Sequence, residues 1–293
     1  MSISFEGQVA IVTGAGNGLG RTHALALAKR GAKVVVNDLG GARDGTGTSS
    51  DAAMEVVNLI KDSGGEAFAH GANVANFDEV QDMVTQAMEK WGRIDILINN
   101  AGILRDKSFK KMTLDEWDLV INVHLNGSAY VTWHAWPIMY EKNYGRIMFT
   151  SSVSGILGSF GQANYGAAKM GMVGLMNNLS REGASHNIRV NCLSPGAATR
   201  MTASVPGSQI DADEPDEKSH PKLVSPAVLY MVSEDAPNGR IIQAAGGRFA
   251  SDMVFSNKGV ALDLDVTWED VAENSDAILD VDSTSWKTTF WKD

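Results

Sequence analysis

The sequence has little that would cross-link it covalently or anchor it in a membrane. Cys192 is the single cysteine among 293 residues, so no internal disulfide forms, and such usage is typical of a reducing compartment. No apolar run reaches the length of about eighteen residues that predicts a membrane-spanning helix. The first residues lack a basic segment ahead of an apolar stretch, and the last residues are not a peroxisomal signal. We therefore expect a cytoplasmic location.

Positive charge is also scarce. Lysine and arginine number 25 against 35 aspartates and glutamates, which gives a net charge of −10. Nucleic-acid binding needs a basic face, so this balance argues against a nucleic-acid partner. Much of the excess is local, because residues 251–293 hold ten acidic residues and three lysines. We expect this range to be an acidic extension that packs on the same domain or on a neighbouring subunit.

What the first 200 residues do contain is an alternation of short apolar runs with longer segments of helical periodicity. This pattern predicts an α/β domain over residues 1–250, with a parallel sheet covered by helices on both faces. The expected strands are 8–14, 32–38, 66–74, 94–102, 145–152, 188–196 and 240–243, and the expected helices are 19–30, 50–63, 78–91, 114–140 and 164–185. A polar, proline-containing stretch interrupts the pattern, and we expect it to form a substrate lid at about 200–226. A capping box at Thr267 predicts a further helix over residues 269–279.

A glycine-rich loop between the first strand and the first helix predicts a dinucleotide site. Glycines let a pyrophosphate approach the backbone at the helix N-terminus, where N–H groups favour anions. The alternative is an ordinary glycine turn, but the strand before and the helix after it are the context that the motif requires. The candidate cofactor residues of this loop are Gly14, Asn17, Gly18, Leu19 and Gly20.

Asp38 ends the second strand, where an acidic side chain accepts hydrogen bonds from both ribose hydroxyls and repels a 2′-phosphate. This favours NAD over NADP. Arg43 follows closely and is able to pair with a phosphate, so NADP remains an alternative, as does a solvated turn for Asp38. Further cofactor candidates stand at later strand ends, where asparagine and glycine are also common as plain turn residues; they are Asn73, Val74, Asn100, Ala101 and Gly102.

The segment 152–169 holds the candidate reacting groups. Tyr165 and Lys169 are four residues apart, which places both side chains on one helix face. An ammonium near a phenol favours the phenolate, so we expect the pKa of Tyr165 to lie below its free value, nearer the working pH. Taken alone, this pair also fits a solvated helix face.

Together these motifs resemble the short-chain dehydrogenase/reductase family, in order and spacing, from about residue 7 to 250. The resemblance implies a Rossmann three-layer fold with a seven-stranded parallel sheet and bound NAD. It implies that Tyr165 is the acid-base group, that Lys169 lowers its pKa and holds the ribose, and that Ser152, rather than Ser151, positions the substrate oxygen. It further implies cofactor contacts from Pro195, Gly196, Thr199, Tyr165 and Lys169, no metal, and a homodimer or homotetramer.

His124 departs from the family pattern. The resemblance places an asparagine at this position as a fourth catalytic residue, three residues before a glycine, here Gly127. A histidine is able to hold a water and relay a proton to Lys169. The alternative is a buried histidine that fills space.

His124 and four other stretches resemble one branch of the family, the (3R)-hydroxyacyl-CoA dehydrogenase domains of peroxisomal multifunctional enzymes. The four stretches are residues 37–41, 144–147, 160–165 and 200–202. The resemblance implies a (3R)-hydroxyacyl-CoA substrate and a free-standing, bacterial-type relative. Alternatives are a hydroxysteroid or other bulky apolar alcohol, or a non-catalytic NAD-binding protein. The predicted lid argues against a CoA substrate, because it contains five acidic residues and only three basic ones, Arg200, Lys218 and Lys222.

Overall fold

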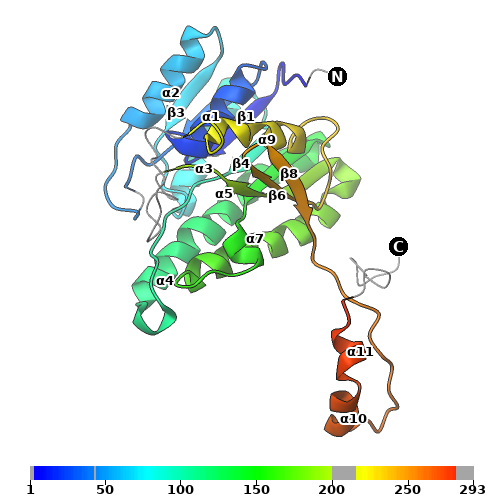
Figure 1. Ribbon diagram of the computed structural model, residues 1–293. Helices are drawn as coiled ribbons and strands as arrows, with labels where there is room; N and C mark the ends of the chain where they lie inside the picture. The colour runs from blue at the N-terminus through cyan, green and yellow to red at the C-terminus, as the bar shows by residue number, and fades with distance from the viewer. Residues whose placement is uncertain (1–2, 43, 200–215, 282–293) are drawn as a thin grey trace. The chain divides into compact units, whose positions relative to one another are not determined.

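The computed structural model describes residues 3–42, 44–199 and 216–281 (Figure 1). The chain divides into two compact units, Met1–Ser251 and Asp252–Asp293. The larger unit has the α/β Rossmann-like architecture that the sequence predicts, with a sheet between two layers of helices. In Figure 1, α1 (Gly18–Ala28), α2 (Asp51–Asp62) and α9 (Ser225–Met231) lie above the sheet, and α4 (Leu114–Ile121), α5 (Gly127–Lys142) and α7 (Ala163–Glu182) lie below it.

The sheet has eight strands in the order β3-β2-β1-β4-β5-β6-β7-β8. Their bounds are Val9–Thr13 (β1), Lys33–Asn37 (β2), Ala67–His70 (β3), Ile96–Asn99 (β4), Gly145–Thr150 (β5), Ile188–Gly196 (β6), Ile241–Ala245 (β7) and Arg248–Asp252 (β8). All pairs from β3 to β7 are parallel. The prediction of seven strands was short by one. The reason is a tight turn at Gly246 and Gly247, whose positive φ angles of 56° and 79° return the chain as β8.

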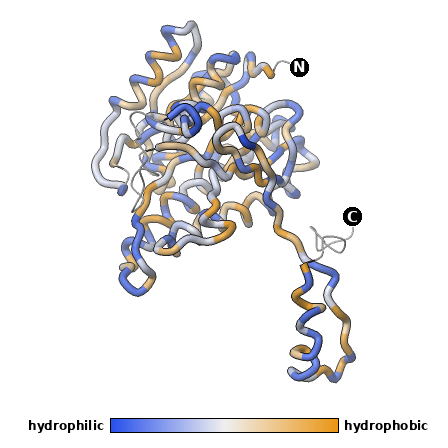
Figure 2. The backbone as a smooth tube through the Cα atoms, in the orientation of Figure 1, coloured by the Kyte–Doolittle hydropathy of each residue, from blue (hydrophilic) through white to orange (hydrophobic). Residues whose placement is uncertain are grey.

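Alternate strand residues face two separate hydrophobic cores. Val12, Val34 and Ile98 pack with the helices of one layer, whereas Ile11 and Val35 pack with those of the other. The buried strand residues therefore read as continuous apolar runs, which is how parallel strands covered on both faces are recognised. Figure 2 shows the complementary pattern along α2, where hydrophobic and hydrophilic residues alternate around the helix.

The five helices predicted for the larger unit are present to within a few residues, and α6 and α9 are two helices that the sequence did not predict. Their bounds are Gly18–Ala28 (α1), Asp51–Asp62 (α2), Phe77–Trp91 (α3), Leu114–Ile121 (α4), Gly127–Lys142 (α5), Val153–Ile156 (α6), Ala163–Glu182 (α7) and Ser225–Met231 (α9), with short turns Phe109–Lys111 (η1), Ala184–His186 (η3) and Pro221–Leu223 (η4). The helix predicted over 114–140 is interrupted, because Asn122–Asn126 (η2) adopts π-helical geometry between α4 and α5.

The third strand ends earlier than predicted. β3 stops at His70, so Asn73 and Val74 lie in the following loop rather than at a strand end. The last ladder pair joins His70 to Asn37. The Asn37 side-chain amide also donates to the carbonyls of His70 and Ala72 at 3.1 and 2.9 Å, which holds the start of the loop against β2.

In the smaller unit, the helix predicted over 269–279 is two short helices, Trp268–Glu273 (α10) and Ser275–Leu279 (α11). The capping box at Thr267 is present, with Asp270 as its second member. Residues 200–215 of the predicted lid, including Arg200, lie outside the described residues. Across the described part of the chain, no helix combines the length and apolar character needed to cross a membrane.

Candidate active site

A cleft of about 930 Å³ opens at the carboxyl ends of the strands. β1 lies between β2 and β4 in the sheet, so the successive strands are added on one side of β1 up to β3 and on its other side from β4 onward. Such a switch point is where open α/β sheets bind ligands. One end of the cleft is formed by loops after β1, β2 and β3, and the other by loops after β4 and β5.

The glycine loop leaves no room for side chains. A Cβ on Gly14 would lie 2.9 Å from the Cα of Ala101, and a Cβ on Gly20 would overlap the carbonyl oxygen of Gly14. Gly14 and Gly18 also have positive φ angles, 63° and 52°, which glycine adopts without strain. The loop is thus a bare backbone cradle at the start of α1, as a pyrophosphate site requires.

Asp38 lines the cleft beside this cradle. Its Oδ2 accepts from the N–H of Gly16 and its Oδ1 from the N–H of Gly40, both at 2.7 Å. Each carboxylate oxygen has a second acceptor position, so the side chain is oriented and still able to bind a diol. The residues present therefore fit the adenosine half of a dinucleotide.

Asn100 connects two loops rather than pointing freely into the cleft. Its Nδ2 donates to the carbonyls of Thr13 and Gly14 at 3.0 and 3.1 Å. The Thr13 hydroxyl in turn accepts from the N–H groups of Asn100 and Ala101. The turn after β4 is thereby locked against the glycine loop, and this locking holds Ala101 and Gly102 on the cleft wall.

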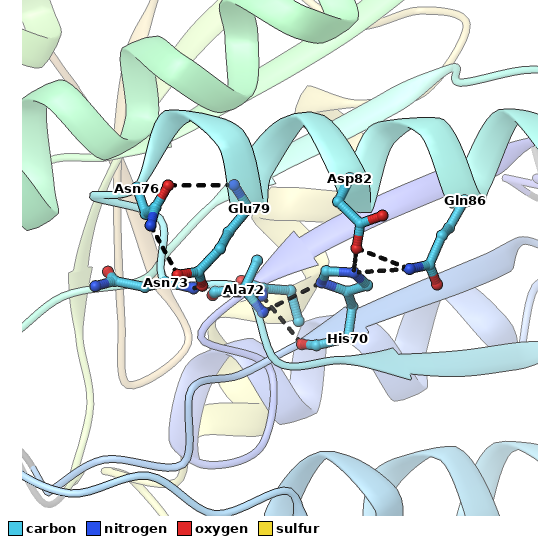
Figure 3. Close-up of polar contacts among 8 residues, drawn as sticks. His70, Ala72, Asn73, Asn76, Glu79, Asp82 and Gln86 are labelled. Atoms are coloured by element: carbon cyan, nitrogen blue, oxygen red, sulfur yellow. Dashed lines mark hydrogen bonds and ion pairs between the residues drawn. The ribbon is translucent and has the colours of Figure 1, made fainter.

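The loop that carries Asn73 is held by α3 (Figure 3). Glu79 accepts from the N–H of Asn73 at 2.8 Å and from the side chain of Asn76, the residue that caps the helix. His70 accepts from the N–H of Ala72 through Nδ1 at 3.1 Å. These contacts fix the loop, so Asn73 and Val74 form the far wall of the dinucleotide end.

Two of the predicted cofactor residues do not line the cleft. Gly20 is covered by the loop itself, and a Cβ on Gly196 would lie 2.8 Å from the Cβ of Ala245. Both serve close backbone packing. The other cofactor candidates, from the glycine loop to Pro195 and Thr199, do line it.

The two adjacent serines have different surroundings. Ser151 is buried and donates to the main-chain carbonyl of Lys169 at 2.9 Å. Ser152 lies at the start of α6, lines the cleft and contacts the phenol of Tyr165. The geometry brings Ser152, and not Ser151, to the tyrosine.

Tyr165 and Lys169 are both buried on α7, at 8% and 2% exposure. The Lys169 ammonium lies 5.2 Å from the centre of the Tyr165 ring and donates to the carbonyl of Thr150 at 2.5 Å. Burial lowers the pKa of Lys169 to about 7, because the charged form loses its hydration.

The prediction of a lowered tyrosine pKa was wrong for this arrangement. Burial raises the pKa of Tyr165 to about 12; the hydrogen bond with Ser152 opposes this rise, and the charge of Asp106 adds to it. The physical reason is that burial outweighs the Ser152 hydrogen bond, while the ammonium of Lys169 lies over the ring and bonds elsewhere.

His124 is fully buried in η2, behind the tyrosine. Its ring meets that of Tyr165 edge-on, with centroids 5.1 Å apart. Its Nε2 lies 3.0 Å from the nitrogen and 2.8 Å from the oxygen of Ile103, while Nδ1 is buried without a partner among the described residues. Burial, followed by the charge of Lys169, lowers the pKa of His124 well below its ordinary value, so the ring is neutral.

Sequence reasoning missed a polar chain at the other end of the cleft. Gln162 donates to Asp106 at 2.8 Å and accepts from the hydroxyl of Ser154 at 2.7 Å. The second carboxylate oxygen of Asp106 is buried without a partner among the described residues. No spacing rule links residues 106 and 162, so only the run around Tyr165 hinted at Gln162.

The model of the family described as "short chain dehydrogenase" matches residues 8–209. The short-chain type dehydrogenase/reductase Rv0148 of Mycobacterium tuberculosis is 45% identical over 94% of this chain and 95% of its own length. Peroxisomal multifunctional enzyme A of Dictyostelium discoideum is 46% identical over 99% of this chain. These findings confirm both resemblances that the motifs indicated.

Among solved structures, full-length peroxisomal multifunctional enzyme type 2 of Drosophila melanogaster is similar over 99% of this chain, with a TM-score of 0.79 and 38% identity. The chain spans 48% of that protein and 64% of the Dictyostelium enzyme. The similarity therefore concerns one part of each multifunctional enzyme.

Proposed function

Because the chain belongs to the short-chain dehydrogenase family and is an oxidoreductase acting on CH–OH groups, we propose that it oxidises (3R)-hydroxyacyl-CoA to 3-oxoacyl-CoA with NAD. The observation that carries the proposal is the convergence of Ser152, Tyr165 and neutral His124 in one cleft with the glycine cradle. The similarity to multifunctional enzymes, on which the resemblance to hydroxyacyl-CoA dehydrogenases rests, supports the substrate class.

In this mechanism the protein residues move one proton and hold one oxygen. Ser152 bonds the substrate oxygen, and Tyr165 takes the hydroxyl proton during oxidation or returns it during reduction. Lys169 contributes positive charge beneath the ring, and His124 offers Nδ1 for a water-linked proton relay to Lys169. The nicotinamide, when bound, accepts the carbon-bound hydrogen as hydride. Asp38 and the backbone of the glycine cradle hold the adenosine and pyrophosphate.

The test is the substitution Tyr165→Phe. We expect kcat with (R)-3-hydroxybutyryl-CoA to fall about a hundredfold or more, because the proton acceptor is lost. Binding of NADH, followed by its fluorescence, persists because the ring remains. Tyr230→Phe is the matched control, since that tyrosine is 45% exposed and does not line the cleft. Full turnover by Tyr165→Phe would contradict the mechanism. Turnover of estradiol but not of the thioester would favour the steroid alternative.

The preference for NAD rests on Asp38. We expect kcat/KM to be at least about tenfold higher with NAD than with NADP, because the carboxylate repels a 2′-phosphate. Asp38→Ser removes the repulsion and is expected to lower this ratio of kcat/KM values, mainly because the KM for NADP decreases. A wild-type enzyme that uses both cofactors equally would overturn the assignment.

We also propose a cytoplasmic homodimer or homotetramer. The support is the single buried cysteine, which suits a reducing compartment, and the family's common mode of assembly. Light scattering on the purified full chain measures its mass, and a monomer would contradict this proposal.

A further inference from the structure

The rim of the cleft at its β4–β5 end carries cations that the mechanism does not use. We define this rim as residues 107–111 and 157–161. The two segments lie together, because the N–H of Lys107 donates to the carbonyl of Gly161 at 2.8 Å. Lys107, Ser108, Phe160 and Gly161 line the cleft itself. Lys110 and Lys111 follow in η1, two and three residues after Ser108 of the lining.

Two of the three rim lysines have unpaired charges. Lys107 is bound to Glu116 at 2.6 Å, so its charge is compensated. Lys110 and Lys111 are exposed, and among the described residues neither has a carboxylate within ion-pair distance. Lys110 and Lys111 are therefore available to pair with an anionic ligand, whereas the acidic residues that follow in the sequence, Asp115, Glu116 and Asp118, lie on α4.

The same rim exposes large apolar side chains. Phe109 is 73% exposed, Leu157 is 75% exposed and Phe160 is 95% exposed. Apolar surface beside unpaired lysines suits a ligand that combines phosphates with a flat base and an apolar arm. The rim follows β4 and β5, whereas Asp38 follows β2, on the other side of β1 in the sheet.

We propose that this rim binds the CoA part of the substrate, with Lys110 and Lys111 on its phosphates and Phe109 and Phe160 against its adenine and pantetheine. The inference rests on the proposed hydroxyacyl-CoA function. It removes the objection that the sequence raised, because the cations come from the turn after β4 rather than from the acidic lid.

The experiment compares two substrates that differ only in the carrier. One is (R)-3-hydroxybutyryl-CoA, and the other is the N-acetylcysteamine thioester of the same acid, which has no phosphate and no base. For the double substitution Lys110→Glu and Lys111→Glu, we expect KM for the CoA thioester to rise about tenfold with kcat preserved. The N-acetylcysteamine thioester keeps its KM within about twofold. Salt raises the wild-type KM for the CoA thioester alone, because it screens exposed charges.

Two controls separate local contacts from net charge and folding. Lys29→Glu with Lys61→Glu makes the same change of charge just after α1 and in α2, outside the cleft lining, and leaves both KM values unchanged. Lys110→Arg with Lys111→Arg preserves the cations and retains the wild-type KM. Equal effects of the glutamate pair on both thioesters, or no effect on either, overturn the rim site and leave the proposed function standing. A wild-type enzyme that oxidises neither thioester overturns both.

Discussion

At the residue scale, the acidity of Tyr165 depends on its burial and on neighbours from two other segments. Burial sets its high pKa, Ser152 lowers that pKa through a hydrogen bond, and Asp106 raises it through its charge. Asp106 is held in place by Gln162, so its carboxylate has a defined position beside the cleft. Asp106 therefore acts on the protonation state of the tyrosine without donating or accepting its proton.

Asp106→Asn is expected to lower the pKa of Tyr165, because a negative charge that opposes the phenolate is removed while the shape is kept. Oxidation needs the phenolate as base, so activity rises with pH through this pKa. The rising limb of kcat/KM against pH then moves to lower pH, by about half a unit to one unit. Steady-state rates between pH 6 and 11 lie on the rising limb, so the shift is measured there as a rate about three- to tenfold higher for the variant at a given pH. A limb that stays in place or moves upward would argue against this role for Asp106.

At the scale of elements, the break between α4 and α5 places His124 behind the active site. The π-helical segment η2 holds the ring against Tyr165, and Ile103 bonds its Nε2. Gly102 lies directly against this ring, and there is no space for a side chain because a Cβ at this position would overlap the imidazole. The glycine after β4 and the histidine in η2 are thus a matched pair across the cleft wall.

This pairing predicts a strong coupling between the two positions. Gly102→Ala is expected to lower the free energy of unfolding by about 2 kcal/mol, because the methyl group overpacks the site. In a His124→Ala background the same change costs less than about 0.5 kcal/mol, since the space is open. Urea denaturation of the four proteins in the cycle measures the coupling. Equal costs in both backgrounds would show that the two residues do not share this space.

At the scale of the whole molecule, the described core belongs to one unit. Every buried hydrophobic residue among those described precedes Ser251. The smaller unit instead exposes apolar side chains, including Leu264, Trp268 at 77% and Leu279 at 74%. We propose that these side chains pack on the larger unit or on a neighbouring subunit, because large exposed apolar side chains favour such contacts.

Removal of residues 252–293 is therefore expected to leave the thermal unfolding midpoint within a few degrees, because both cores remain. We expect the truncation to change either the oligomeric mass or the KM, because it removes the apolar side chains that we propose make this contact. Light scattering and steady-state kinetics on the truncated and full chains measure these effects. A truncated protein with unchanged mass and unchanged kinetics would show that the extension is only a solvated terminus.

Much of this structure was predictable from residues that lie close together in the sequence. The apolar runs predicted the strands, and the spacing of Ser152, Tyr165 and Lys169 placed them together because a single turn and helix connect them. Two elements escaped this reasoning. β8 depends on a turn at Gly246 and Gly247, and the loop after the early end of β3 is held by hydrogen bonds from the Asn37 side chain. Neither effect leaves a periodic signal.

The sequence alone determined the layered α/β fold, the glycine cradle and the candidate reacting groups, because each of these depends on residues close together in the chain. Only the tertiary structure decided the high pKa of Tyr165, the partnership of Asp106 with Gln162, and the rim formed by residues 107–111 and 157–161. These features depend on burial and on contacts between segments about fifty residues apart, which a linear pattern does not encode.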